Sequence, residues 1–266
     1  MKTKRIEKTF ADLRRKNEKA LVGFLSAGDP DIKTSLKIIE SMCKAGIDIM
    51  ELGIPFSDPT ADGPVIQRSS ARALKNGVNI AAVLEMTRKI RNFSDIPVIL
   101  FTYYNPVHSY GAVAFYNDAL NADADGVLVV DLPPEESDEM TSKWPGNELA
   151  LIRLVAPTTL RDRMEKIASS ASGFIYLVSK TGVTGSDGLD TDDIAVHAKL
   201  LHSVTRLPVC VGFGISTPDD IKRIAPHADG IVIGSAFERI IEENPGNPGI
   251  AKILGKEVKR LKTATK

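Results

Sequence analysis

The feature that most constrains the fold is an eightfold alternation of short apolar segments with helical patterns. The apolar segments are rich in β-branched residues and nearly continuous, which is typical of parallel strands covered on both faces. They span residues 20–26, 47–53, 97–103, 125–130, 149–155, 173–179, 207–213 and 229–234. Between them, apolar residues recur at helical spacing, as in 32–43, 83–90 and 160–168. Strand followed by helix, repeated, indicates parallel strands joined by right-handed crossovers.

Eight strands are the number that a closed α/β barrel requires, and such barrels need about 250 residues in one domain. The chain has 266 residues. We therefore predict an α/β fold, a single (β/α)8 TIM barrel with an extra N-terminal helix, in which residues 1–266 form one domain. Ile6, Phe10 and Leu13 lie on one stripe of that first helix. Because the helix precedes the first strand, we expect it to cover the N-terminal end of the barrel.

The composition excludes several classes of partner and site. Lys plus Arg and Asp plus Glu are both 34, so the formal net charge is zero, whereas nucleic-acid binding usually leaves a strongly basic balance. No apolar run approaches the ~18 residues of a membrane helix, and residues 1–19 lack an apolar signal core. We expect a cytoplasmic protein that binds neither nucleic acid nor membrane. The four histidines show no paired spacing, so we predict no metal site.

In a barrel of this class the active site forms where the strands end at their carboxyl side. Glu51 lies near the end of the second strand, which is followed by a long loop, rich in Pro, Gly and Asp, that runs to residue 64. A carboxylate within an apolar strand is costly unless it is paired, and burial raises its pKa toward neutrality. Glu51 therefore suits a proton shuttle. A core ion pair with Lys or Arg explains the pattern equally well.

Two further acids stand at strand ends, and each has a structural alternative. Asp62 lies on the same loop as Glu51 and is followed by Gly63 and Pro64, so it could be a turn or cap residue. Asp131 ends the fourth strand and could be catalytic or could cap a helix. For both acids, spacing by itself favours the structural role.

Glycines gather at the ends of the last three strands. The sixth strand runs into Gly182 and Gly185, the seventh contains Gly212 and is followed by Gly214, and the eighth ends at Gly234 before a helix. Loops after strands seven and eight, with a helix N-terminus, form the recurrent phosphate site of this fold. Tight turns alone are the alternative. A dinucleotide fingerprint is excluded because Thr217 stands where the third glycine would be.

Read together, these segments resemble the tryptophan synthase alpha subunit family. The stretch ELGIPFSDPTADGPVIQ (51–67) is the longest and most specific match. The stretches YYNP (103–106), DLP (131–133), VSKTGVTG (178–185), VGFGI (211–215) and GS (234–235) follow it in order. The likeness thus covers nearly the whole chain. Lys180 and Thr181 depart from the residues that many relatives carry, Arg and Ser, and both lie beside the sixth loop rather than at the matched catalytic positions.

The resemblance implies a lyase that cleaves indole-3-glycerol phosphate to indole and glyceraldehyde 3-phosphate in L-tryptophan biosynthesis. It assigns catalysis to Glu51 as acid and base, to Asp62 as the partner of the indole N–H, and to Tyr176 in the site wall. It implies that Thr184 orders the sixth loop against Asp62. The substrate-binding residues implied are Phe24, Phe101, Tyr103, Leu128 and Phe213 around the indole, and the amides of Gly185, Gly214, Gly234 and Ser235 around the phosphate.

The resemblance also implies a partner, the tryptophan synthase beta subunit, in an alpha2beta2 tetramer. Residues 55–58 and 105–106 match the docking side. No cofactor is expected in this chain, because the pyridoxal phosphate would belong to the beta subunit. Three alternatives stay open: a free-standing indole-3-glycerol-phosphate lyase, a sugar-phosphate isomerase on the same scaffold, and a non-catalytic module that docks on a beta subunit and activates it.

Overall fold

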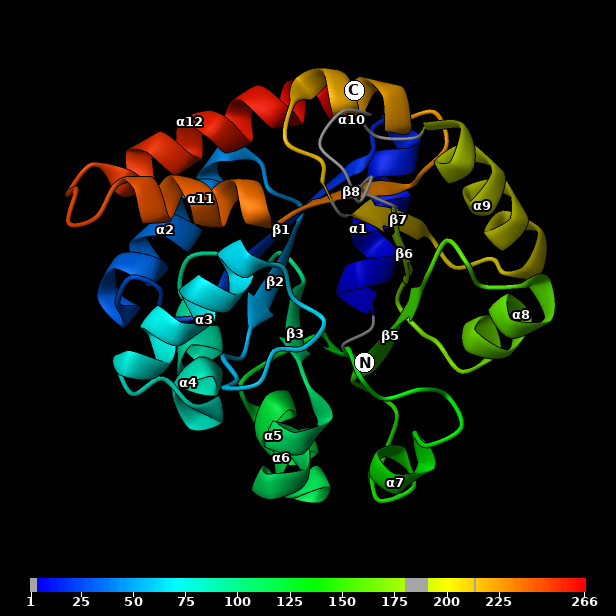
Figure 1. The fold of residues 1–266 in the computed structure, drawn as a ribbon, viewed down its shortest axis with the longest axis horizontal. Coiled ribbons are helices and arrows are strands. Elements are labelled where there is room, and N and C mark those ends of the chain that lie inside the picture. Colours follow the sequence, from blue (N-terminus) through cyan, green and yellow to red (C-terminus); the bar gives the residue numbers. More distant parts are fainter. Residues whose placement is uncertain (1–3, 180–190, 213) are drawn as a thin grey trace.

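The computed structural model describes residues 4–179, 191–212 and 214–266, and its centre is a closed barrel of parallel strands (Figure 1). The strands follow one another around the barrel in sequence order, from β1 to β8, and β8 pairs with β1. Their bounds are β1 Ala20–Ser26, β2 Ile49–Gly53, β3 Val98–Thr102, β4 Gly126–Val129, β5 Ala150–Val155, β6 Ile175–Val178, β7 Val209–Gly212 and β8 Gly230–Ile233. The prediction of a (β/α)8 barrel is confirmed, and each observed strand lies within its predicted segment.

The helices form the outer layer of the barrel (Figure 1). Several strands are followed by more than one helix, so that α3 and α4 both lie between β2 and β3. The helices are α1 Lys4–Arg15, α2 Ile32–Ala45, α3 Pro64–Lys75, α4 Ile80–Ile90, α5 Tyr104–Tyr110, α6 Ala112–Asn121, α7 Asp138–Thr141, α8 Arg161–Ser169, α9 Thr191–Val204, α10 Pro218–Ile224, α11 Ser235–Glu243 and α12 Ile250–Lys262, followed by the 3-10 turn Thr263–Thr265.

Local sequence signals fix the ends of these helices. The Asp31 side chain accepts a hydrogen bond from the Thr34 N–H at the start of α2, and Gly46 ends that helix with a φ of 104°. At α10, Thr217 caps the helix, Pro218 follows in its first turn, and Asp220 completes a reciprocal capping box. The Ser-Thr-Pro-Asp stretch therefore begins a helix as its residue types indicate.

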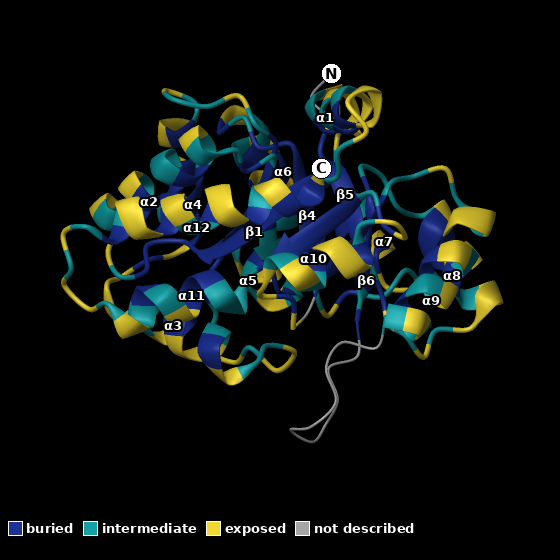
Figure 2. Cartoon of the chain, turned by 90° about the horizontal axis from the view of Figure 1, so that it is seen from above, coloured by how far each residue is buried: buried dark blue, intermediate teal, exposed yellow. Residues whose placement is uncertain are grey.

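Alternation along each strand divides the buried side chains between two cores. Figure 2 shows that the strands are buried, whereas the helices around them carry exposed residues. Met50 and Leu52 of β2 point outward into the core between the barrel and the helices. Ile49 belongs to the core inside the barrel, so Glu51, two residues further on, faces the same interior. Both faces of the strands are covered, which explains why their sequences are nearly continuously apolar.

Helix α1 closes the N-terminal end of the barrel, as predicted. Its Ile6, Phe10 and Leu13 are buried and belong to the interior core, together with side chains from the strands. The rings of Phe10 and Phe174 lie 6.0 Å apart. The apolar stripe of α1 thus fills the end of the barrel opposite to the one where the loop after β2 begins.

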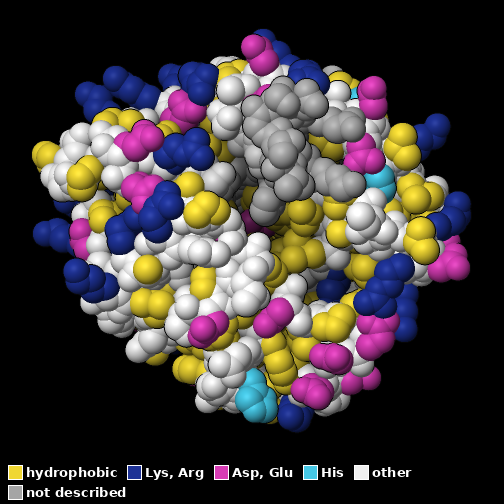
Figure 3. Space-filling model, in the orientation of Figure 1, with side chains coloured by type: hydrophobic (Ala, Val, Ile, Leu, Met, Phe, Trp, Pro, Cys, Tyr) yellow, Lys and Arg dark blue, Asp and Glu magenta, His cyan; other side chains and the backbone are white. Residues whose placement is uncertain are grey.

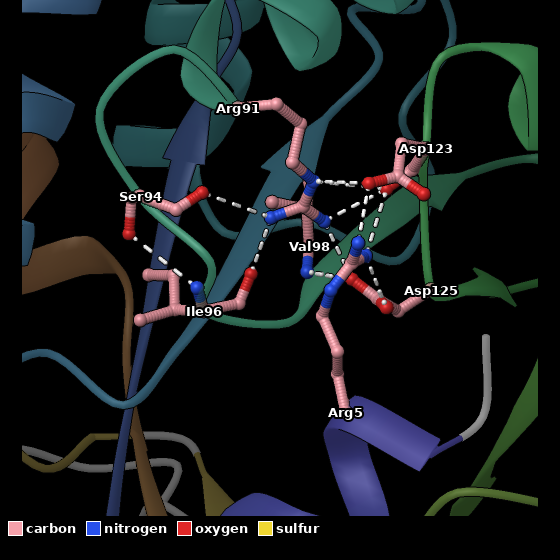
Figure 4. Close-up of polar contacts among 7 residues, drawn as sticks. All are labelled: Arg5, Arg91, Ser94, Ile96, Val98, Asp123 and Asp125. Atoms are coloured by element: carbon pink, nitrogen blue, oxygen red, sulfur yellow. Dashed lines mark hydrogen bonds and ion pairs between the residues drawn. The ribbon is translucent and has the colours of Figure 1, made fainter.

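An ionic cluster fastens α1 to the same N-terminal end (Figure 4). The Asp125 carboxylate, fully buried, accepts hydrogen bonds from Arg5 of α1 at 2.9 Å and from Arg91 at 2.6 Å. It also accepts the Val98 N–H at 2.9 Å, at the start of β3. Arg5 pairs with Asp123 as well. Because these charges are paired and lie far from the carboxyl ends of the strands, they support the fold.

Candidate active site

A cavity of about 260 Å³ opens at the carboxyl ends of the strands. Figure 3 shows the face onto which it opens, with hydrophobic side chains gathered in a hollow at its centre. Its lining combines apolar walls with a few polar groups. The apolar side chains are those of Phe24, Phe101, Val65, Ile66, Ile215 and Val232. The polar side chains are those of Glu51, Asp62, Tyr176, Ser235 and Arg239. Such a pocket, largely apolar with a few placed polar groups, is typical of a small-molecule site.

Glu51 lies on the cavity wall and is fully buried. Among the described residues, neither of its carboxyl oxygens has a hydrogen-bond partner. Burial without a compensating charge raises the pKa of Glu51 to about 8. The core ion pair that the sequence left open is not found in the described part of the chain. At neutral pH this carboxyl group therefore carries a proton that it can give to a ligand.

Asp62 lines the same cavity, and Tyr103 holds it in place. The Tyr103 hydroxyl donates a hydrogen bond to Asp62 Oδ2 at 3.0 Å and accepts one from the Ala61 N–H at 3.0 Å. Burial raises the pKa of Asp62 to about 6, and the hydrogen bond from Tyr103 opposes that rise. The cap of α3 is Gly63, with no side-chain hydrogen bond, so Asp62 is not used as a helix cap.

Tyr176 reaches the cavity from β6 because its neighbour in β7 is a glycine. A Cβ on Gly212 would lie 2.2 Å from the Tyr176 hydroxyl, so any larger residue would displace the ring. Burial, with the Glu51 charge as a further cause, raises the pKa of Tyr176 well above its usual value. Phe24 and Phe101 pack edge to face with centroids 5.0 Å apart and form an aromatic wall of the cavity.

The β7 and β8 side of the cavity has the features of an anion site. Gly214 has a φ of 72°, a conformation that favours glycine, and it lines the cavity. Gly234 and Ser235 line it too, at the N-terminus of α11, where free N–H groups and the helix dipole attract anions. Arg239 also lines the cavity, and sequence analysis missed it. Its spacing of four residues from Ser235, which places both on one helix face, is a signal that could have found it.

The structure gathers most of the predicted site residues and separates a few. Tyr103 stands behind Asp62, in a smaller adjoining cavity. Leu128 is fully buried in the interior core and is not among the residues that line the main cavity. Asp131 accepts the Tyr104 N–H at 2.7 Å, at the start of α5, so it supports a helix, although not the one that follows its own strand. Thr184, Gly185 and Phe213 lie outside the described residues.

In residues 4–179, 191–212 and 214–266, no three His, Cys, Asp or Glu side chains converge as a metal site would require. No helix in the described part of the chain is both long and apolar enough to cross a membrane.

The fold and the cavity together define a barrel enzyme whose site pairs protonatable carboxyl groups with an anion-binding helix terminus. Comparison with known proteins gives the family. The family model for the tryptophan synthase alpha chain matches residues 10–266. A tryptophan synthase alpha chain of Desulfosudis oleivorans is 63% identical over 262 residues, which are 98% of this chain and 99% of the relative.

Solved structures agree with this comparison. A crystal structure of the tryptophan synthase alpha subunit from Legionella pneumophila has 36% identity and a TM-score of 0.89, covering 98% of each chain. A crystal structure of tryptophan synthase from M. tuberculosis, in an aminoacrylate-bound form, has 29% identity and a TM-score of 0.88, covering 98% of this chain and 99% of that one. The chain belongs to the tryptophan synthase alpha chain family. It is accordingly a lyase of tryptophan biosynthesis.

Proposed function

We propose that the chain cleaves indole-3-glycerol phosphate to indole and glyceraldehyde 3-phosphate by a retro-aldol reaction. The observation that carries this proposal is Glu51, a fully buried carboxyl group with a pKa of about 8 in the wall of an aromatic-lined cavity. Indole leaves poorly as a carbanion, so its ring must first be protonated. That reaction needs one poised acid and one fixed anion, and Glu51 and Asp62 supply them.

The proposed reaction uses Glu51 twice. Its carboxyl group gives its proton to the indole ring carbon that bears the side chain, which places a positive charge on the ring. The Glu51 carboxylate then takes the proton from the adjacent side-chain hydroxyl. The C–C bond breaks, its electron pair returns to the ring, and the hydroxyl oxygen becomes the aldehyde oxygen. Glu51 ends protonated, so the reaction balances without an external proton.

The two ends of the cavity suit the two ends of this substrate. An ionised Asp62 accepts a hydrogen bond from the indole N–H and stabilises the positive charge that develops there. Phe24 and Phe101 contact the ring, and Tyr176 lines the site beside Glu51. The amides of Gly214, Gly234 and Ser235 bind the phosphate, and the family match assigns Gly185 to the phosphate, Phe213 to the indole and Thr184 to the ordering of the sixth loop. Anchoring the phosphate uses remote binding energy to orient the ring.

We further propose that the chain, acting as one domain, docks on a beta subunit in an alpha2beta2 tetramer in the cytoplasm. The similarity to solved tryptophan synthases supports this assembly. The proposed docking segments are residues 55–58 after β2 and 105–106 in the first turn of α5, within which Ser57, Asp58 and Asn105 are exposed. Any pyridoxal phosphate would belong to the beta subunit, and this chain would use no cofactor of its own.

The test is indole release by the purified chain. With indole-3-glycerol phosphate we expect slow indole formation by the chain alone and faster formation when a tryptophan synthase beta subunit is added. No indole under either condition rejects the lyase proposal. Full activity alone, unchanged by the beta subunit, identifies a free-standing lyase. An isomerised sugar phosphate without indole identifies a sugar-phosphate isomerase.

The pH dependence of the reaction gives a sharper prediction for Tyr103. We expect kcat/KM to rise as Asp62 ionises near pH 6 and to fall as Glu51 ionises near pH 8. In Tyr103→Phe, Asp62 loses the hydrogen bond that favours its charged form. The acid limb should therefore move upward by about one pH unit, while the alkaline limb stays in place. The matched control is Tyr110→Phe, because the Tyr110 hydroxyl likewise donates a hydrogen bond to an aspartate, Asp118, but lies away from the cavity. An unmoved acid limb contradicts this role of Tyr103.

A further inference from the structure

A second buried glutamate, Glu238 of α11, lies just outside the cavity and has no part in the proposed reaction. Its side chain is fully buried, and its Oε1 accepts the Ser26 N–H at 2.5 Å, at the end of β1. Within the described residues, Oε2 receives no hydrogen bond from any N–H or O–H group. The Glu238 carboxyl lies within hydrogen-bonding reach of the carboxylate of Asp29. Two acceptors in contact require a proton between them.

The charge of Asp29 is already used on its other side. Asp29 is buried and forms a two-pronged ion pair with Arg72 of α3, with Nε–Oδ1 at 2.8 Å and NH2–Oδ2 at 2.7 Å. Arg72 also donates a hydrogen bond from NH1 to Glu242 Oε1 of α11 at 3.0 Å, and Arg68 of α3 binds the same carboxylate. Arg68 and Arg72 thus balance the charges of Asp29 and Glu242, and the described residues of this cluster offer no further cation to an ionised Glu238. The proton between Asp29 and Glu238 therefore belongs on Glu238.

Burial and the nearby Asp29 charge both raise the pKa of Glu238 well above its usual value. The side chains that face Glu238 are Asp29 from the loop after β1, Arg72 from α3 and Glu242 from its own helix, together with the backbone of Ser26. Every acid but Glu238 has an arginine partner. Loss of the Glu238 proton would leave two adjacent buried carboxylates that repel each other.

The cluster connects the two functional ends of the cavity. Helix α3 begins at Pro64, two residues after Asp62, and α11 begins at Ser235, beside the anion site. The two helices pack against each other and against β1 (Figure 2). Ser26 of β1 also bonds Ser69 of α3, with the hydroxyl oxygens 2.6 Å apart. A displacement of α11 from Asp29 would therefore change the spacing between Asp62 and the anion site.

We propose that Glu238 is a positioning residue that holds the N-terminus of α11 in register with β1 and α3 through a proton it shares with Asp29. This proposal rests on the proposed function in one respect: it takes indole-3-glycerol phosphate as the ligand that binds Asp62 at one end and the anion site at the other. When rising pH removes the proton, repulsion from Asp29 moves the anion site away from Asp62 and weakens binding of the phosphate end.

Two substitutions at position 238 separate this role from general packing. Glu238→Gln keeps the acceptor oxygen for the Ser26 N–H and supplies an N–H for Asp29, but it cannot ionise. Glu238→Ala removes both bonds. For indole-3-glycerol phosphate near neutral pH, we expect Glu238→Gln to keep KM within about twofold and Glu238→Ala to raise it about tenfold or more, with kcat changed much less. Glu243→Gln and Glu243→Ala, at the exposed neighbour, are matched controls that should leave KM unchanged.

The dependence of KM on rising pH provides the deciding measurement. The wild-type KM should rise as Glu238 loses its proton, and this rise should be absent in Glu238→Gln. Glu51 ionises in both proteins, so the difference between them isolates Glu238. An infrared difference spectrum should also show one protonated carboxyl band that Glu238→Gln lacks. Three outcomes would each overturn the proposal. They are a KM that rises with pH equally in the wild type and Glu238→Gln, an infrared difference spectrum without the carboxyl band, and a folded Glu238→Ala whose KM equals that of the wild type.

A binding experiment distinguishes failure of this proposal from failure of the proposed function. Calorimetric titration with glycerol 3-phosphate needs no catalysis. We expect its affinity to fall about tenfold in Glu238→Ala and to be retained in Glu238→Gln near neutral pH. Absence of indole release with this pattern of binding would reject the lyase and keep the positioning role. Indole release by the wild type, with equal glycerol 3-phosphate affinity in all three proteins, would reject the positioning role alone.

Discussion

Glu51→Gln should reduce the rate of indole release by at least about 10²- to 10⁴-fold, the range typical of general acid–base catalysis. Glutamine has nearly the same shape and fits the same buried position, but its amide cannot give a proton to the indole ring or take one from the hydroxyl. Neither carboxyl oxygen of Glu51 has a hydrogen-bond partner among the described residues, so the substitution breaks no existing hydrogen bond there.

The measurement is single-turnover indole formation by the chain with its beta partner. Glu85→Gln, at a half-exposed position in α4, is the matched control and should keep the wild-type rate. Glu51→Gln should also raise the rate at which the beta subunit forms tryptophan from free indole and serine as much as the wild-type chain does, which shows that docking is intact. Near-normal indole release by the variant would assign the proton transfer to another group. Intact tryptophan formation from indole-3-glycerol phosphate would favour the non-catalytic docking module.

The same substitution should stabilise the fold. The pKa of Glu51 rises from 4.5 to about 8 on folding. Between these values the folded chain binds more protons than the unfolded chain, so the free energy of unfolding falls as pH rises, by about 1.4 kcal/mol per pH unit. Glutamine removes this loss, which amounts to about 3 kcal/mol near neutral pH. Denaturant unfolding at several pH values checks this prediction. The difference in free energy of unfolding between Glu51→Gln and the wild type should vanish near pH 4.5 and grow toward pH 8.

Asp62→Asn should lower kcat by about 10²- to 10³-fold, the range seen when one group that stabilises a developing charge is removed. Asparagine keeps an oxygen that can accept hydrogen bonds from Tyr103 and from the indole N–H. It lacks the negative charge that stabilises the positively charged, protonated ring. The loss should therefore appear in kcat more than in KM.

The pH profile distinguishes a lost charge from a disturbed loop. In Asp62→Asn the acid limb near pH 6 should disappear, because no group with the pKa of Asp62 remains to ionise. The control variant Asp162→Asn, at an exposed position in the first turn of α8, should keep both the wild-type kcat and the acid limb of the pH profile. A variant that keeps the acid limb but loses activity would show that the loop, and not the carboxylate charge, is what Asp62 contributes.

The fold could be predicted because it depends on patterns that repeat along the chain. The eight apolar segments predicted each strand of the described residues, although several observed strands are shorter than their segments by up to three residues. The stripe of Ile6, Phe10 and Leu13 correctly placed α1 over the end of the barrel. In each case, the local spacing of apolar side chains determines which face must be buried.

The candidate site was only partly predictable. Glu51 stood out because a charge within an apolar strand is rare, yet the sequence left a core ion pair equally open, and only the three-dimensional arrangement shows which side chains are near it. Arg239 was missed because exposed arginines on helices are common. Glu238 was missed because its hydrophilic character indicated solvent, whereas it is fully buried against Asp29.

By itself, the sequence determined the barrel, the order of its strands and the family, since these follow from periodicity and from motifs that are continuous along the chain. Only the tertiary structure decided the protonation states of Glu51, Asp62 and Glu238. A pKa depends on burial and on the charges within a few ångströms. Those neighbours come from distant segments: the groups around Glu238 lie at positions 26, 29 and 72, more than 160 residues away along the chain.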